Sequence, residues 1–311
     1  MILVAGSANL DFVVRAPHIP APGETVLGRE FSTFPGGKGA NQAVACARAG
    51  SAATRLLSAM GKDDFATPIE ASLRDAGVGL VTIRVTGTPT GTAFICVSDD
   101  AENAITVAPG ANACLMPEHL PNLQGVSHLL LQLETPLPTV IAFAQAARAQ
   151  DVTVVLNAAP AQALPGELLA LVDILIVNEG ELASITQCKG SIALALQQLV
   201  VPTVVVTLGH RGSCARTPTH LLFQNAYPIT PVDTTAAGDT FCGTLVAALS
   251  QGRGMAAALR YASAASALCC TRPGAQSSIP MASEVADFLE LQSAPHHRTT
   301  DAPQTYCGMT P

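Results

Sequence analysis

The sequence contains no tryptophan and is poor in aromatic and charged residues, which make up 4% and 13% of its 311 positions. Its 16 lysines and arginines form no cluster and are outnumbered by 23 acidic residues, so the formal net charge is −7. A nucleic-acid-binding surface needs a basic patch or stripe, and we therefore exclude that class of protein. The apolar runs fall well short of the roughly 18 residues that span a membrane, and no signal-peptide pattern opens the chain. We expect a cytoplasmic protein without a membrane partner.

Metal and hydrolase signatures are also missing. The nine cysteines are scattered without a C-x-x-C pair, which argues against a zinc site, and their odd number fits buried, reduced thiols better than a disulfide framework. The sequence has neither H-E-x-x-H nor G-x-S-x-G. Zinc-enzyme and serine-hydrolase interpretations therefore have no support.

Small aliphatic residues are abundant. Hydrophobic residues make up 49% of the sequence, enough to bury a large core and to exclude wholesale disorder. In the second part of the chain, strand-like apolar runs at 126–133, 152–156, 174–177 and 204–208 alternate with helix-like segments at 137–149, 166–171, 192–199, 237–250, 255–269 and 283–291. This alternation predicts an α/β protein with a mostly parallel sheet covered on both faces. We also predict a hairpin over 213–227 and a mobile polar tail over 293–311.

One candidate site lies in segment 232–243, where small residues lead into the Ala-rich helix at 237–250. Unpaired amides at such a helix N-terminus form an anion site at the positive end of the helix dipole. Asp239 would repel a phosphate that is merely bound there. Its carboxylate makes sense if it takes a proton from a hydroxyl that attacks a phosphoryl group. By spacing alone, an acidic residue that offsets the helix dipole is an equally good explanation.

A second glycine-rich segment, 34–42, reads Phe-Pro-Gly-Gly-Lys-Gly-Ala-Asn-Gln. It matches neither the Walker A motif nor the dinucleotide-binding fingerprint. Its glycines allow the backbone to approach a ligand closely, and Asn41 can hydrogen-bond a polyol. A tight turn would use similar residues, so this segment alone is a weak indication of a site.

Together, in this order and at this separation, the two segments resemble the two signatures of the ribokinase-like (phosphofructokinase B) carbohydrate kinases. Shorter matching stretches extend the resemblance from about residue 4 to about residue 291; they are 6–11, 22–26, 110–113, 131–134, 156–161, 177–181, 207–212 and 272–278. The resemblance implies a Rossmann-like three-layer sandwich with a central, mostly parallel sheet, in one domain over 1–292. It also implies a small β-sheet lid, built here from about 12–35 and 80–107, and a homodimer formed through the lids.

The resemblance implies ATP-dependent phosphorylation of D-ribose at its 5-hydroxyl. Asp239 matches the family's catalytic base, which also contacts both substrates. The amides of Ala236, Ala237 and Gly238 match its anion hole. The positions that match the sugar site are Asn9, Asp11, Gly37, Lys38, Gly39, Ala40, Asn41 and Glu134. Among these, Asn9 and Asp11 would grip the secondary hydroxyls of the sugar.

Other matching positions concern the nucleotide and the cations. The nucleotide positions are Asn178, Thr207, Leu208, Gly209, His210, Arg211, Gly212, Gly238, Asp239 and Ser263. Glu181 completes the family's Asn-x-x-Glu, which positions Mg²⁺ largely through water, although a solvated carboxylate at a helix start would look the same. The positions around the monovalent-cation site, which implies activation by K⁺, are Asp233, Thr235, Cys269, Arg272, Gly274 and Ser278, most of them through backbone carbonyls.

Two alternatives stay open. One is a kinase of the same family for 2-deoxyribose, another pentose or a nucleoside, although Asn9 and Asp11 together favour a sugar with both ring hydroxyls. The other is a catalytically inactive sugar-binding regulator, against which the intact Asp239 argues. The sequence departs from the family pattern at Thr244 and Ala66, but neither departure removes a group that does chemistry.

Overall fold

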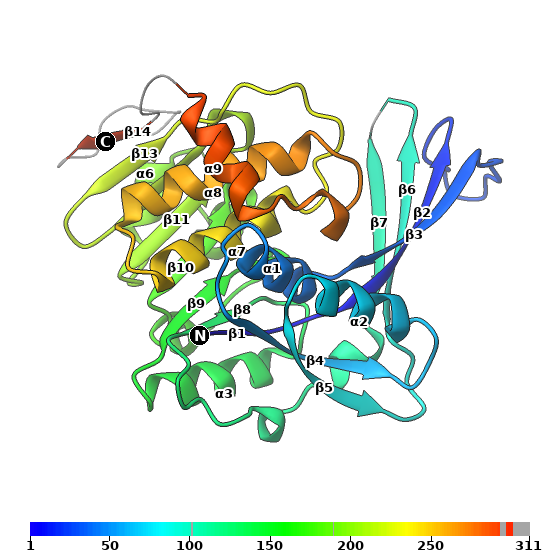
Figure 1. The fold of residues 1–311 in the computed structure, drawn as a ribbon, viewed down its shortest axis with the longest axis horizontal. Helices are drawn as coiled ribbons and strands as arrows, with labels where there is room; N and C mark the ends of the chain where they lie inside the picture. Colours follow the sequence, from blue (N-terminus) through cyan, green and yellow to red (C-terminus); the bar gives the residue numbers. More distant parts are fainter. Residues whose placement is uncertain (101, 189, 293–296, 301–311) are drawn as a thin grey trace.

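A ten-stranded sheet lies at the centre of the protein in the computed structural model, which describes residues 1–100, 102–188, 190–292 and 297–300 (Figure 1). The strand order is β14-β13-β12-β11-β10-β9-β8-β1-β4-β5. The bounds are β1 (Ile2–Ala5), β4 (Thr54–Gly61), β5 (Gly79–Val85), β8 (His128–Leu131), β9 (Thr153–Asn157), β10 (Ile174–Asn178), β11 (Thr203–Thr207), β12 (Ser213–Arg216), β13 (Leu221–Gln224) and β14 (His297–Thr300). The strands from β11 to β5 in this order are parallel, and β12 to β14 continue the sheet in antiparallel pairs.

Helices cover both faces of this sheet. One face carries α1 (Lys38–Ala47), α2 (Ala66–Asp75), α7 (Ala237–Ser250), α8 (Met255–Cys270) and α9 (Ala282–Glu290); the other carries α3 (Leu137–Arg148), α4 (Gly166–Leu169), α5 (Glu179–Thr186) and α6 (Ile192–Gln197). Successive strand side chains point to opposite faces, so Val4 and Leu130 enter the first core while Leu3 and Leu131 enter the second. The predicted three-layer α/β sandwich is confirmed.

A separate four-stranded sheet stands beside the large one (Figure 1). Its order is β3 (Glu30–Gly36), β2 (Asn9–Ala16), β6 (Gly91–Ser98) and β7 (Asn103–Ala108). The second predicted lid segment, 80–107, is wrong at its start, because β5 pairs in parallel with β4 at the edge of the large sheet. Val81, Ile83 and Val85 pack against the second core there, and the chain enters the small sheet only at Gly91.

The predicted helices and the hairpin of β12 and β13 are present, with ends shifted by a few residues at most. The elements β4, α2 and α5 were not predicted. Within the predicted tail, residues 297–300 form β14 and pair with the edge strand β13. The other predicted tail positions, 293–296 and 301–311, lie outside the described residues.

Candidate active site

Polar side chains gather where the parallel strands end. Each of five neighbouring strands contributes a polar group at its carboxyl end or just beyond it; these groups are Asn9 after β1, Glu134 after β8, Asn157 on β9, Asn178 on β10 and Thr207 on β11. In open α/β sheets, ligands bind outside the carboxyl ends of the strands. The N-termini of α1 and α7, which follow the two glycine-rich segments, lie at the same place, since Asn41 of α1 contacts Asp239 of α7.

Asp239 lies in the first turn of α7 and is 9% exposed. Nδ2 of Asn41 donates to its Oδ2 at 3.0 Å, and Nε2 of Gln42 donates to its Oδ1 at 2.9 Å. Both carboxylate oxygens therefore accept a hydrogen bond from an uncharged amide. The two hydrogen bonds fix the plane of the carboxylate, which suits a group that has to accept a proton.

The predicted anion hole lies one residue before this carboxylate. Ala236 has a left-handed backbone (φ 59°) and starts the helix. The amide of Ala237 donates to the carbonyl of Thr234 at 3.2 Å, so it is engaged in a turn and only the other two amides fit the prediction directly. A β-carbon on Gly238 would meet no atom within 4 Å, so space is open in front of the helix end.

Asn9 and Asp11, the predicted sugar-site residues on β2, are both buried. Asn9 is 2% exposed, and its Oδ1 accepts a hydrogen bond from Nδ2 of Asn112 at 2.8 Å. Because Asn112 also accepts from the amide of Ala8 through Oδ1, the Asn9 amide is held with its Nδ2 available to donate. The side chain of Asp11 lies on the same face of β2 as that of Asn9, two residues earlier. The two side chains together offer a donor and an acceptor to adjacent hydroxyls.

The Asp11 carboxyl is the most perturbed acid of the site. Burial, together with the nearby carboxylates of Glu134 and Asp239, raises its pKa to about 7. A β-carbon on Gly36 would stand 2.1 Å from its Oδ2, so only glycine leaves room for this carboxyl. Both observations show that the Asp11 carboxyl lies in crowded, acidic surroundings. A ligand hydroxyl that donates a hydrogen bond to this carboxyl would stabilise its ionised form.

Glu134 and Asn41 complete this side of the site. Oε2 of Glu134 accepts from the Ser7 hydroxyl at 2.5 Å and from the amide of Lys38 at 3.3 Å. Oδ1 of Asn41 is buried and has no partner among the described residues. A buried acceptor without a partner costs free energy, so this oxygen is a natural contact for a ligand hydroxyl.

The start of α1 needs its glycines for close approach. Gly37 has φ 89°, and a β-carbon on it would stand 2.7 Å from the amide nitrogen of Asn9. On Gly39 a β-carbon would stand 2.6 Å from the carbonyl carbon of Gly6. The two segments are therefore packed backbone against backbone, and Ala40, which donates to the carbonyl of Ser7 at 2.9 Å, closes the contact.

The Lys38 ammonium interacts electrostatically with carboxylates of both the predicted sugar site and the predicted nucleotide site. The carboxylate of Asp239 raises its pKa most, against the lowering effect of burial, and Glu134 and Glu181 raise it as well. No ion pair to its ammonium is formed by the residues that the structure describes. The Lys38 ammonium therefore lies near three carboxylates, at a place where a polyanionic ligand could enter the site.

Two residues of the predicted nucleotide and Mg²⁺ sites, Asn178 and Glu181, form the capping box of α5. Oδ1 of Asn178 accepts from the amide of Glu181 at 2.8 Å, and Oε2 of Glu181 accepts from the amide of Asn178 at 2.8 Å. Burial raises the pKa of Glu181, while the Asn178 amide and the charge of Lys38 lower it. One oxygen of Glu181 thus caps the start of α5, but the side chain is buried and is not the solvated carboxylate of the alternative explanation. The other oxygen remains for a ligand.

The loop after β11 forms a short turn. The amide of Leu208 donates to the carbonyl of Gly212 at 2.8 Å. Gly212 has φ 104°, and a β-carbon on it would stand 2.0 Å from the carbonyl oxygen of Gln224. Leu208 is buried, whereas Gly209 and His210 are exposed, so the exposed backbone of this turn is what a nucleotide could contact.

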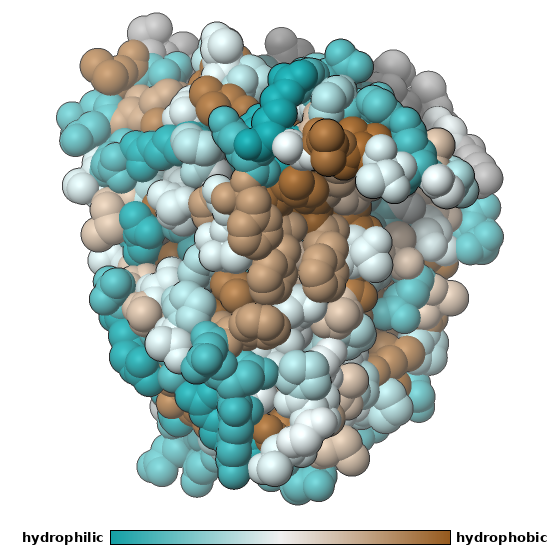
Figure 2. Space-filling model, turned by 90° about the vertical axis from the view of Figure 1, so that its right-hand side faces the viewer, coloured by the Kyte–Doolittle hydropathy of each residue, from teal (hydrophilic) through white to brown (hydrophobic). Residues whose placement is uncertain are grey.

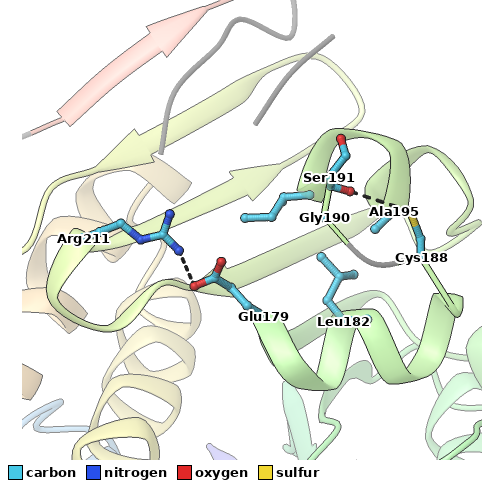
Figure 3. A pocket seen from close by; sticks show the side chains of 9 residues that line it. Glu179, Leu182, Cys188, Gly190, Ser191, Ala195 and Arg211 are labelled. Carbon is cyan, nitrogen blue, oxygen red and sulfur yellow. Dashed lines mark hydrogen bonds and ion pairs between the residues drawn. The ribbon is translucent and has the colours of Figure 1, made fainter. Parts of the chain in front are cut away.

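The side chain of Arg211 points toward α5. Its guanidinium pairs with Glu179 at the edge of a pocket of about 220 Å³ between α5 and α6, whose lining also includes Leu182 and Ile192 (Figure 3). Ser263 is buried on α8, one turn before Ser266, whose hydroxyl donates to the carbonyl of Ala237 at 2.9 Å. Ser263 therefore lies about one helical turn from the contact between α8 and the start of α7.

The six positions predicted around a monovalent cation are gathered behind the start of α7. The Asp233 carboxylate accepts from the amides of Thr235 (2.8 Å) and Gly274 (2.9 Å). Sγ of Cys269 lies 3.6 Å from the carbonyl of Thr235 and 3.0 Å from the hydroxyl of Ser278. The Arg272 side chain instead pairs with Glu284 at 2.5 Å, so that residue can offer only its main chain.

Sequence reasoning missed four buried polar residues of the site. They are Gln42, Asn112, Gln132 and Asn157. Gln42 was inside the second glycine-rich segment, and its signal was a polar residue at a position otherwise surrounded by small apolar ones. Asn112, Gln132 and Asn157 lie in the matching stretches 110–113, 131–134 and 156–161, but nothing in their spacing shows that they meet.

No three histidine, cysteine, aspartate or glutamate side chains come together as a metal cluster among the described residues. Of the helices in the same part of the chain, none has both the length and the apolar character to cross a bilayer.

Comparison with known proteins places this geometry in context. The sequence model of the pfkB family of carbohydrate kinases matches residues 1–282. A ribokinase from Haemophilus influenzae is 38% identical over 301 residues, which cover 93% of this chain and 98% of that protein. Two solved structures are similar over at least 93% of this chain and 99% of theirs. They are ribokinase from Thermotoga maritima (37% identity, TM-score 0.84) and Arabidopsis thaliana ribokinase complexed with ribose and ATP (33%, TM-score 0.86).

Proposed function

The chain belongs to the pfkB family of carbohydrate kinases, and on this premise we propose that it transfers the γ-phosphoryl group of ATP to the 5-hydroxyl of D-ribose. The observation that carries the proposal is the Asp239 carboxylate, held through both oxygens by Asn41 and Gln42 at the N-terminus of α7. The similarity to proteins named ribokinase supports D-ribose as the sugar. Asn9 and Asp11 support a substrate with two adjacent ring hydroxyls.

In the proposed reaction Asp239 takes the proton of the 5-hydroxyl as its oxygen attacks the γ-phosphorus. A bond from this oxygen to phosphorus forms while the bond from phosphorus to the bridging oxygen of ADP breaks. Charge that develops on the transferring group faces the unpaired end of α7, with the amides of Ala236 and Gly238, and the ammonium of Lys38. The products are D-ribose 5-phosphate and ADP.

Mg²⁺ enters with the nucleotide in this proposal. Glu181 is buried, and the carboxylate oxygen that does not accept from the Asn178 amide fits a metal ion that keeps several of its waters. When bound, the ion neutralises charge on the β- and γ-phosphates. For K⁺, the carboxylate of Asp233 and the converging oxygens of Thr235 and Ser278 provide the oxygen ligands that hard cations take.

The small sheet is proposed to be the lid and the homodimer interface. Asp11 and Phe12 are consecutive residues of β2, so their side chains lie on opposite faces of this sheet. Phe12 stacks on Phe94 at 5.4 Å and on Phe31 at 6.1 Å, and Phe31 and Phe94 are 65% and 54% exposed. Figure 2 views the molecule from this side and shows apolar surface gathered in the middle of the face. Such a patch marks an interaction surface. A second copy of the small sheet presents the same exposed rings and would cover it.

The test is ADP release from Mg-ATP with a panel of D-ribose, 2-deoxyribose, arabinose, fructose and nucleosides, each with and without K⁺. We expect D-ribose to give the highest kcat/KM and K⁺ to raise it. A different sugar in first place would retain the kinase and reject the substrate. Absence of sugar-dependent release across the panel would reject the proposed function in favour of a regulator.

A further inference from the structure

Gln42 lies between the catalytic carboxylate and the central sheet. It is fully buried on α1 and contacts three side chains, from α7, from β9 and from the residue that follows β8. Its Nε2 donates to Oδ1 of Asp239 at 2.9 Å and to Oδ1 of Asn157 at 2.9 Å, and its Oε1 accepts from Nε2 of Gln132 at 2.7 Å. A buried glutamine is unusual in a protein core, and here all the contacts lead to the site.

The direction of the Gln42 amide is set by the backbone of the sheet. The carbonyl of Ile176 on β10 can only accept, so Asn157 turns its Nδ2 toward it at 3.2 Å. Oδ1 of Asn157 then faces Gln42 and can only accept as well. Gln42 must answer with its NH₂ group, and the second N–H of that group points at Asp239.

The opposite direction is disfavoured on every side. A flipped Gln42 amide would place its Oε1 against Oδ1 of Asn157 and against the Asp239 carboxylate, leaving buried acceptors face to face. It would also turn an NH₂ group toward the NH₂ group of Gln132. One backbone carbonyl of β10 thus determines, through two side-chain amides, that the catalytic carboxylate receives a donor.

We propose that Gln42 is a positioning residue for phosphoryl transfer: it holds Oδ1 of Asp239 by an N–H whose direction the sheet dictates through Asn157. The role rests on the proposed function, because it requires Asp239 to be the base. With Asn41 on Oδ2, Gln42 aligns the carboxylate toward the attacking hydroxyl. The residue touches neither sugar nor nucleotide in this role, so it affects turnover and leaves substrate binding intact.

The experiment compares steady-state kinetics of the wild type with the variants Gln42→Met, Asp239→Asn and the double variant. Gln42→Met keeps the length and volume of the side chain and removes its N–H groups. We expect kcat to fall about 100-fold, as a misaligned catalytic group does, while KM for D-ribose and for ATP changes less than about threefold. In the Asp239→Asn background, Gln42→Met should lower kcat by no more than about twofold, because the group it aligns is gone.

Thr139→Val is the matched control, because Thr139 is also buried and its hydroxyl donates one hydrogen bond, at 2.8 Å to the carbonyl of Leu115, away from the site. It should keep wild-type kcat. A wild-type kcat in Gln42→Met, or the same fall in kcat with and without Asp239, would overturn the positioning role. If Gln42→Met does not fold, Asn157→Leu, which frees the Gln42 amide to flip, should lower kcat about 10-fold, and an unchanged kcat would overturn the role.

The two proposals fail in different ways. An active wild type with an unaffected Gln42→Met variant overturns the role of Gln42 alone. A wild type that releases no ADP with any sugar overturns the proposed function, and the role of Gln42 with it.

Discussion

Gly243 of α7 lies against the main chain of α1, so that a β-carbon on it would stand 2.4 Å from the carbonyl oxygen of Gln42. Its own carbonyl accepts from Sγ of Cys46 at 3.2 Å, one turn further along α1. Helices usually pack 8–10 Å apart, depending on the side chains at the contact, and a glycine permits the closest approach. Asp239, one turn before Gly243, reaches Asn41 and Gln42 because the two helices are this close.

Replacing Gly243 by alanine should therefore damage both stability and turnover. The added methyl meets backbone, which cannot move aside, and overpacking of this kind costs about 1–3 kcal/mol. We expect a lower midpoint of urea unfolding and a lower kcat, because α7 carries Asp239 away from its donors. Gly166→Ala is the control, since a β-carbon there meets no atom within 4 Å. An unchanged kcat in Gly243→Ala would show that this close contact does not position Asp239.

Asp239→Asn tests the base directly. The amide is nearly isosteric with the carboxylate but cannot accept the proton, and a general base contributes about 10²–10⁴-fold to the rate. We expect kcat to fall by about 10³-fold, while isothermal titration still detects binding of D-ribose and of ATP. A variant that turns over at close to the wild-type rate would remove Asp239 from the role of base.

The pH dependence of sugar binding should follow Asp11. Burial, with the charges of Glu134 and Asp239, raises the pKa of this carboxyl to about 7. Sugar hydroxyls donate to the ionised form, so binding lowers this pKa and releases a proton. Near pH 7 the released amount approaches about half a proton per site, because half of the carboxyls are protonated beforehand.

Two measurements check this expectation. KM for D-ribose should rise as the pH falls from 8 to 6, whereas KM for ATP should stay nearly level. Calorimetric titrations with D-ribose in buffers of different ionisation enthalpy should detect the released proton. Asp11→Asn should abolish the release and weaken sugar use far more than ATP binding. Equal losses for both substrates would move Asp11 out of the sugar site.

The aromatic face of the small sheet should control the oligomeric state. The double variant Phe31→Ser and Phe94→Ser removes the two most exposed rings of the face that Phe12 shares. Sedimentation equilibrium should give a dimer for the wild type and a monomer for the variant. Val200→Ser is the control, because Val200 is 77% exposed and lies in the large domain, before β11. A variant that remains dimeric, or a wild type that is monomeric, would contradict the proposed interface.

The layered architecture and the two glycine-rich segments that flank the site could be predicted from the order of the residues. Apolar runs such as 152–156 and 174–177 have the length of buried strands, and β9 and β10 lie there. The helices that begin at Lys38 and Ala237 follow segments of glycine and other small residues. Their starts are therefore set by the local sequence and could be located from the residues alone. The family resemblance, carried by these motifs, then implied Asp239 as the base.

How these parts meet depends on contacts between residues far apart in the chain. The pairing of β5 with β4 depends on hydrophobic contacts beneath the large sheet, which a strand-like sequence at 79–85 does not specify. The contact from Gln42 to Asp239 joins residues 197 positions apart, and the direction of its amide is set by Ile176 through Asn157. Strand and helix formation follow from local periodicity, whereas the direction of a buried hydrogen bond is a property of its partners, which the fold alone brings together.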